Sequence, residues 1–150
     1  MNMSLENNIS IKIKEAMKSK DVLRLEALRA IKTSLLLLKT EDRNKEVSES
    51  DEVLMLQKLV KQRKESAAIF RKQNRVDLAE PEEAQAEVIS EFLPEQLSES
   101  EIEKIVIETI NKISAQGMKD MGKVMGVLSG KLAGKADGKT ISSIVRQKLL

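Results

Sequence analysis

The chain has 150 residues, 41% of them hydrophobic and 33% charged, and its 26 basic and 24 acidic side chains leave a formal net charge of +2. Aromatic residues are nearly absent, with two Phe and no Trp or Tyr, so neither a β-sandwich nor a β-barrel is expected. Because Cys and His are also absent, disulfides, thiolate or imidazole metal sites and Cys–His or Ser–His catalytic pairs are excluded, and we expect no metal site and no cofactor.

Four amphipathic helices are predicted in the first part of the chain, from apolar side chains spaced three and four residues apart. They cover approximately residues 5–19, 22–40, 49–73 and 77–92. Asp21 and Ser48 are the expected N-caps of the second and third helices. Pro81 is compatible with the fourth helix in its first turn, so we expect it there.

Pro94 marks a predicted boundary, because a proline disfavours the helical conformation of the residue before it. Beyond it, Ser98 and Glu101 match a capping box that opens a fifth helix, which Gly117 is expected to end. An apolar stripe over residues 121–132 predicts a sixth helix, and Asp137 is the expected cap of a seventh. We therefore expect an all-α protein with an antiparallel four-helix bundle over residues 1–93 and a three-helix domain over residues 94–150.

The glycines form an unusual row. All six lie between residues 117 and 138, and the last five are spaced four apart. A glycine inside a helix costs about 1 kcal/mol relative to alanine, so Gly122, Gly126 and Gly130 on one predicted helix need an explanation. The row indicates close packing of a neighbouring helix, or a smooth backbone surface kept clear for a polyanion or partner, or tolerance of a weak helix. Gly134 and Gly138 are interpreted as turn residues.

Positive charge gathers at the C-terminal end. Residues 1–92 hold 17 basic and 17 acidic side chains, whereas residues 118–150 hold seven basic and two acidic ones, a net of +5. Such cations indicate either a solvated helix face or contact with phosphates, and the scarcity of acids favours contact. Without aromatic side chains, that contact is expected with the nucleic-acid backbone rather than with bases. The candidate residues are Lys119, Lys123, Lys131, Lys135, Lys139 and Arg146.

Arg63 falls in the apolar stripe of the third predicted helix. An unpaired buried guanidinium is costly, so we expect a carboxylate of the fourth helix, Glu87, to form a structural ion pair with it.

Four segments together resemble the GatB/YqeY family, and the resemblance covers the whole chain; they are Lys61–Ser66, Phe92–Ser98, Asp120–Gly126 and Gly134–Gly138. The chain is most similar to stand-alone YqeY-like proteins, which implies a helical bundle followed by a three-helix domain. The same module forms the tail of the B subunit of tRNA-dependent amidotransferase, which contacts tRNA while the chemistry takes place in another domain. That domain is missing here, so the family-level activity, carbon–nitrogen ligation with glutamine as amido-N-donor, is not expected of this chain alone.

We therefore expect a non-catalytic tRNA-binding or accessory module, and no catalytic residue is assigned. The alternative is a helical adaptor that docks a protein partner through the glycine row and Met118, Met121 and Met125; an enzyme of unknown chemistry is a third reading. The N-terminus lacks a signal pattern and the longest apolar run, Leu35–Leu38, is too short to cross a membrane, so a cytoplasmic location is expected. The sequence leaves the oligomeric state open.

Overall fold

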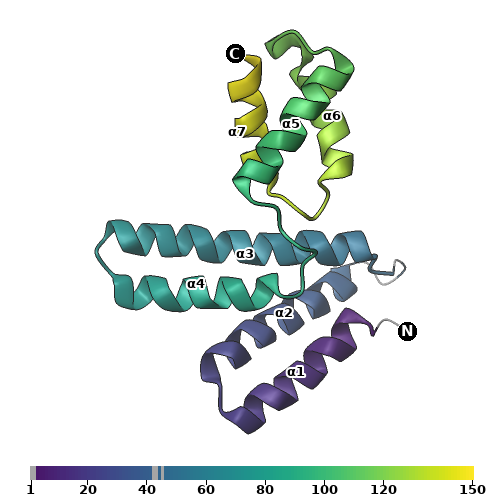
Figure 1. Cartoon of the computed structure of the whole chain (residues 1–150). Helices are drawn as coiled ribbons and strands as arrows, with labels where there is room; N and C mark the ends of the chain where they lie inside the picture. The colour runs from purple at the N-terminus through teal and green to yellow at the C-terminus, as the bar shows by residue number, and fades with distance from the viewer. Residues whose placement is uncertain (1–2, 42–43, 45) are drawn as a thin grey trace. The chain divides into compact units, whose positions relative to one another are not determined.

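The computed structural model describes residues 3–41, 44 and 46–150, and within these ranges every regular element is a helix (Figure 1). The predicted all-α fold class is therefore confirmed. By its internal contacts the chain divides into two compact units, Met1–Leu93 and Pro94–Leu150.

The first unit consists of two helical hairpins. In one, α1 (Leu5–Ser19) packs against α2 (Val22–Glu41); in the other, α3 (Glu49–Lys72) packs against α4 (Val76–Ser90), and α2 also packs against α4 (Figure 1). The central position of α2 follows from its apolar stripe, of which Ala27, Leu28 and Ile31 are each 0% exposed. The other helices complete this core with Ile9, Ala16, Leu56, Leu59, Val60, Ala86 and Ile89.

The start of α3 has the predicted capping arrangement. The Ser48 hydroxyl accepts a hydrogen bond from the backbone N–H of Asp51 at 3.1 Å, and the Asp51 carboxylate accepts one from the backbone N–H of Ser48 at 3.1 Å. Such a cap satisfies backbone donors that have no partner inside the helix and stabilises it by about 1 kcal/mol. α3 therefore begins where the sequence predicts.

The expected position of Pro81 is wrong. α4 begins at Val76, so Pro81 is its sixth residue and lies in the second turn, not the first. A proline there has no N–H to donate to the carbonyl of Asp77, four residues earlier. Both residues are exposed, which leaves that carbonyl accessible to solvent instead of buried without a partner.

The second unit contains α5 (Glu99–Ile113), the short 3₁₀ helix η1 (Met118–Asp120), α6 (Met121–Lys131) and α7 (Gly138–Leu149). The three α-helices pack on one another around a core of their own. Its buried members are Ile102, Val106, Val124, Leu128, Leu132, Ala136, Ile141, Val145 and Leu149.

Hydrogen bonds connect Gln96 and Leu97, near the beginning of this unit, to the segment between α6 and α7. The Leu97 N–H donates to the Lys135 carbonyl at 2.9 Å, and the Gln96 side-chain amide donates to the Gly134 carbonyl at 2.7 Å. Gly134 is buried with φ of +76°, a left-handed turn conformation that glycine adopts without steric cost. The turn role predicted for Gly134 is therefore confirmed.

The end of α5 differs from the prediction. The helix stops at Ile113, and Ser114 adopts the left-handed conformation with φ of +56° that closes it. Gly117, expected to end the helix, lies three residues farther on with φ of +141°, in the segment that leads into η1. Ser114 thus takes the position that the sequence assigns to Gly117, three residues earlier in the chain.

Candidate nucleic-acid interface

One face of α6 combines lysine and glycine residues. The helix buries Val124 and Leu128 on its inner side. At about 100° per residue, Lys123, Gly126 and Gly130 lie within about 60° of one another, on the side largely opposite to the buried pair. All three are exposed, so this face of α6 presents cationic side chains and bare backbone together.

The glycines of this face have open space in front of them. A Cβ atom added at Gly122, Gly126 or Gly130 meets no heavy atom within 4 Å. A neighbouring helix held close by small residues would place atoms at van der Waals distance from that position. Close helix packing as the explanation of the row is therefore wrong for the part of the chain that the structure describes. The open backbone surface and the weak-helix explanations remain.

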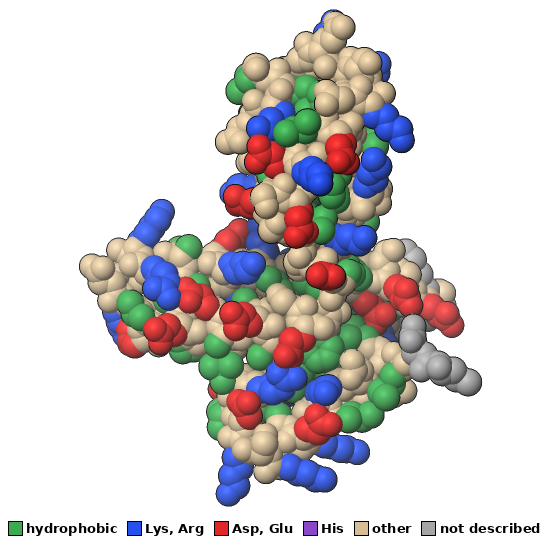
Figure 2. Space-filling view, viewed as in Figure 1, with side chains coloured by type: hydrophobic (Ala, Val, Ile, Leu, Met, Phe, Trp, Pro, Cys, Tyr) green, Lys and Arg blue, Asp and Glu red, His purple; other side chains and the backbone are tan. Residues whose placement is uncertain are grey.

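All six candidate cations are exposed, and Figure 2 shows Lys and Arg side chains standing on the surface of the second unit. Lys148 makes the contrasting case, because its ammonium group lies 2.7 Å from the Glu103 carboxylate. Within the described residues, no carboxylate lies within 4.0 Å of a candidate cation. Their charges are thus available to an external anion; they are Lys119, Lys123, Lys131, Lys135, Lys139 and Arg146.

The beginning of α7 adds backbone donors to these cations. Asp137 is the N-cap, as predicted, but its side chain makes no capping hydrogen bond. The first turn of α7 contains no acidic residue and carries Lys139, and helix N-termini favour anions. Arg146, seven residues after Lys139, lies on the same exposed face of α7. The turn role predicted for Gly138 is wrong, because Gly138 is the first residue of α7, as the predicted Asp137 cap implies.

Comparison with protein families identifies the chain. The model of the family described as Yqey-like protein matches residues 6–149, which is essentially the whole chain. The chain belongs to the YqeY-like family. The resemblance carried by the four sequence segments is therefore confirmed, and with it the membership of the wider GatB/YqeY group.

Two curated fungal proteins are similar to this YqeY-like chain. One is the Altered inheritance of mitochondria protein 41, mitochondrial, of Lachancea thermotolerans, which is 32% identical over 108 residues, or 71% of this chain and 58% of the relative. The other is an uncharacterised protein of Schizosaccharomyces pombe, 46% identical over 48 residues, or 32% of this chain and 39% of the relative. The YqeY-like chain thus matches less than two thirds of the length of either relative. No helix within the described residues is long and apolar enough to cross a membrane.

The methionines expected to join the glycine face do not all lie on it. Met121 and Met125 are partly buried and pack against the core of the second unit. Met118, in η1, is 41% exposed, and Val127 of α6 is 39% exposed beside the glycines. The apolar part of this face is therefore smaller than the sequence pattern indicates. It includes Val127, which the sequence pattern does not single out.

The predicted Arg63–Glu87 ion pair is wrong. The Arg63 Nε donates to the Gln85 side-chain oxygen at 3.1 Å, and its Nη1 donates to the Leu59 carbonyl at 3.3 Å. The Gln85 amide in turn donates to the Glu26 carboxylate at 3.1 Å. Residues two apart on a helix point in nearly opposite directions, so the register that brings Gln85 to Arg63 turns the exposed Glu87 away.

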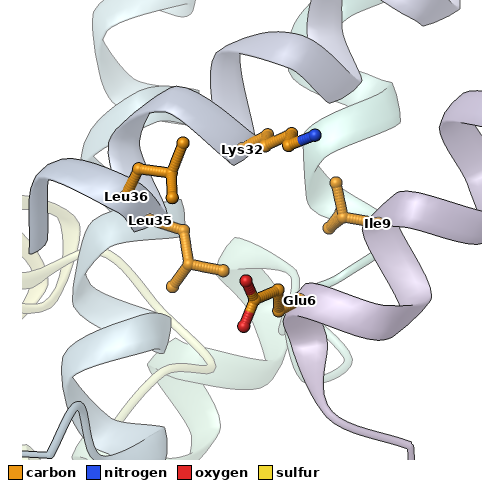
Figure 3. Close-up of a pocket in the computed structure, with 5 residues that line it drawn as sticks. All are labelled: Glu6, Ile9, Lys32, Leu35 and Leu36. Atoms are coloured by element: carbon orange, nitrogen blue, oxygen red, sulfur yellow. The ribbon is translucent and has the colours of Figure 1, made fainter. Parts of the chain in front are cut away.

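The small pocket between α1 and α2 offers no room for a ligand. Figure 3 shows Glu6 and Ile9 of α1 and Lys32, Leu35 and Leu36 of α2 around it. Its volume is about 10 Å³, which is at most the space of one water molecule. Within the described residues, no three acidic side chains gather closely enough to hold a metal ion.

The shifted titrating groups lie in the first unit and have ordinary structural causes. Burial raises the pKa of Glu52, the neighbouring Glu49 carboxylate raises it further, and Lys39 opposes them. The pKa of Glu83 is lowered, chiefly by its hydrogen bonds from the Arg71 guanidinium, one of which is 2.9 Å long. Both shifts are thus accounted for by burial and by contacts with neighbouring charged side chains of the first unit.

Proposed function

We propose that this YqeY-like chain is a non-catalytic tRNA-binding or accessory module related to tRNA-dependent amidotransferase. Its second unit contacts the sugar–phosphate backbone of the RNA through the lysine and glycine face of α6 and the first turn of α7. The observation that carries this proposal is the coincidence of exposed cations without carboxylate partners and glycines with open space before them. Bare backbone lets a phosphate approach closely, and the cations supply the attraction.

The composition of this unit supports recognition of backbone shape rather than base sequence. Both Phe residues of the chain, Phe70 and Phe92, belong to the first unit, so the second has no aromatic side chain on which an unpaired base could stack. Lysine contacts with phosphates position an RNA without reading its sequence. The module therefore binds structured RNA with low sequence preference and strong salt dependence.

Family membership supports the same direction. The resemblance to the amidotransferase tail implies contact with tRNA in a protein whose chemistry takes place elsewhere. We also propose that residues 1–93 and 94–150 are separate domains, and that the protein acts in the cytoplasm. The mitochondrial designation belongs to the Lachancea relative, of which this chain matches 58% of the length.

The second candidate function is a protein adaptor. The exposed Met118 and Val127 favour it, since they add apolar contact area to the glycine face. A partner helix docked there would pack against Gly126, and its affinity would not change with salt concentration. RNA bound by its phosphates would instead be released as the salt concentration increases.

A salt titration of binding to bulk tRNA tests the proposal. Each phosphate contact contributes about one unit to the slope of log affinity against log salt, so reversing Lys119, Lys123 and Lys135 to Glu lowers the slope by about three. The matched control reverses three exposed lysines of the first unit, namely Lys14, Lys18 and Lys72. Equal losses in the two triple variants would refute the proposed surface, because the charge change is the same in both.

A further inference from the structure

The first unit exposes leucines at the end of α2. Of the four consecutive leucines there, Leu35 is buried, whereas Leu36 is 49% exposed and Leu37 is 63% exposed. Leu54 of α3 is 64% exposed. A helix that packs on one side can bury only one stripe of its residues, so a run of leucines leaves apolar side chains on the surface. Apolar surface that gathers in one place on a protein is typical of an interaction site.

The two most exposed of these leucines, Leu37 and Leu54, lie in one groove. Leu37 and Leu38 of α2 and Leu54 and Met55 of α3 line an open groove of about 430 Å³ between the two helices. The groove lies within the first unit, where the end of α2 and the beginning of α3 come together (Figure 1). It is open rather than enclosed, which favours a protein surface over a small ligand as its occupant.

Charge along the groove changes sign from one end to the other. Glu41 and Asp51 line one end, and Lys58 lines the other, next to the uncharged Ser34 and Gln62. A two-fold rotation about an axis through the middle of the groove exchanges its ends. The acidic end of one copy then meets the basic end of the other, so the groove is complementary to itself in charge as well as apolar along its middle.

We propose that the groove between α2 and α3 is a homodimer interface, occupied by the same groove of a second copy of this chain in an antiparallel arrangement. Leu37 and Leu54 form the apolar centre of the interface, and the acidic end of each groove, which contains Glu41, meets the Lys58 end of the other. A stable interface buries more than about 1,000 Å² in total, so the flanking surfaces of α2 and α3 complete the contact around the groove. This inference is independent of the proposed RNA-binding surface, which lies in the second unit.

Sedimentation equilibrium over a roughly hundredfold range of protein concentration tests the dimer. The unaltered chain is expected to pass from monomer to dimer mass, and Leu54→Glu is expected to weaken the dimer about tenfold or more, because it places an unpaired carboxylate in the apolar centre. Ile69→Glu is the matched control: Ile69 is also on α3 and 56% exposed, but it is not part of the groove. Retained helical circular dichroism shows that each variant folds. A chain that stays monomeric throughout, or a dimer that Leu54→Glu leaves unchanged, would overturn the proposal.

A charge-exchange experiment tests the antiparallel arrangement. Glu41→Lys places a lysine in the end that meets Lys58, and Lys58→Glu places a carboxylate in the end that meets Glu41, so in each variant the facing ends attract less and the dimer is weaker. An equal mixture of the two variants restores the opposite charges of the facing ends and is expected to yield a heterodimer, and the double variant, whose ends are both reversed, is expected to form a homodimer. Self-association of the single variants in preference to the mixture would contradict the arrangement, and so would no effect of any charge change at low salt.

Discussion

Replacement of Gly126 by alanine tests the open face of α6 most directly. Gly126 is interior to the helix, has no left-handed conformation, and an added Cβ meets nothing within 4 Å. The substitution therefore gains the helix propensity of alanine without a clash, which stabilises the unit by about 1 kcal/mol. For a unit of this size, that gain corresponds to an increase of about 4–8 °C in the melting temperature.

Thermal unfolding followed by circular dichroism measures this gain, and Gly134→Ala is the internal control of opposite sign. Gly134 has φ of +76°, where a Cβ costs about 1–2 kcal/mol, so its replacement lowers the melting temperature. Gly126→Leu extends the test to function, because a large side chain keeps a phosphate backbone away from the helix. Its tRNA affinity is expected to fall about tenfold although its fold persists.

The combination of results separates the explanations of the glycine row. A lower melting temperature for Gly126→Ala would mean that a packed neighbour fills the space, and the description of this face as open would be refuted. Unchanged tRNA binding by Gly126→Leu would mean that the weak helix is merely tolerated there. A loss of protein binding that salt does not affect would favour the adaptor.

Three further predictions concern the stability of each unit by itself. Glu52→Gln is expected to raise the melting temperature at neutral pH and to leave it unchanged below pH 4.5, the ordinary pKa of a glutamate. The raised pKa of Glu52 means that its protonated form stabilises the fold in acid, and this contribution is lost as the pH rises through the raised pKa. An equal effect of the substitution at both pH values would contradict this reasoning. Gln85→Leu should destabilise the first unit by about 1–3 kcal/mol in denaturant titrations, because the half-buried Arg63 loses one of its two acceptors, whereas Glu87→Gln should change little; the reverse order would support the Arg63–Glu87 ion pair instead. A fragment of residues 94–150 should melt cooperatively on its own, since it has its own core, and a non-cooperative, unfolded fragment would refute the proposed domain division.

The course of the helices was predictable because periodicity and caps are local. The first helix begins and ends at the expected residues, Leu5 and Ser19, and the cap at Ser48 forms as its spacing indicates. At the end of α5 the predicted boundary failed, because Ser114 adopts the left-handed conformation before Gly117 is reached. The expected place of Pro81 failed for another reason: even in a helix that begins at Asp77, Pro81 is the fifth residue and already lies past the first turn.

The partner of Arg63 could not be predicted because it depends on register between helices. The sequence places Arg63 in an apolar stripe and offers several polar side chains on the facing helix, but a shift of two residues turns the contact from Glu87 to Gln85. The neutral partner changes the physical description. Arg63 is half-buried and keeps contact with the carboxylate of Glu26 through an amide, so it does not require a fully desolvated ion pair.

The candidate site was likewise predictable only in part: the sequence shows which residues share a helix face, but not what lies in front of that face. Spacing of four predicts that Gly122, Gly126 and Gly130 share a helix face, but whether that face is packed or open depends on where the neighbouring helices lie. The described structure leaves it open, so the cost of up to about 1 kcal/mol for each glycine is not offset by close packing. Only Gly126 is interior to α6, whereas Gly122 and Gly130 lie in its first and last turns and cost less, so the row costs between about 1 and 3 kcal/mol, a noticeable part of the 5–15 kcal/mol by which folded domains are typically stable. An external backbone that needs this space explains the cost and the unpaired lysines beside it together, whereas tolerance of a weak helix explains the glycines alone.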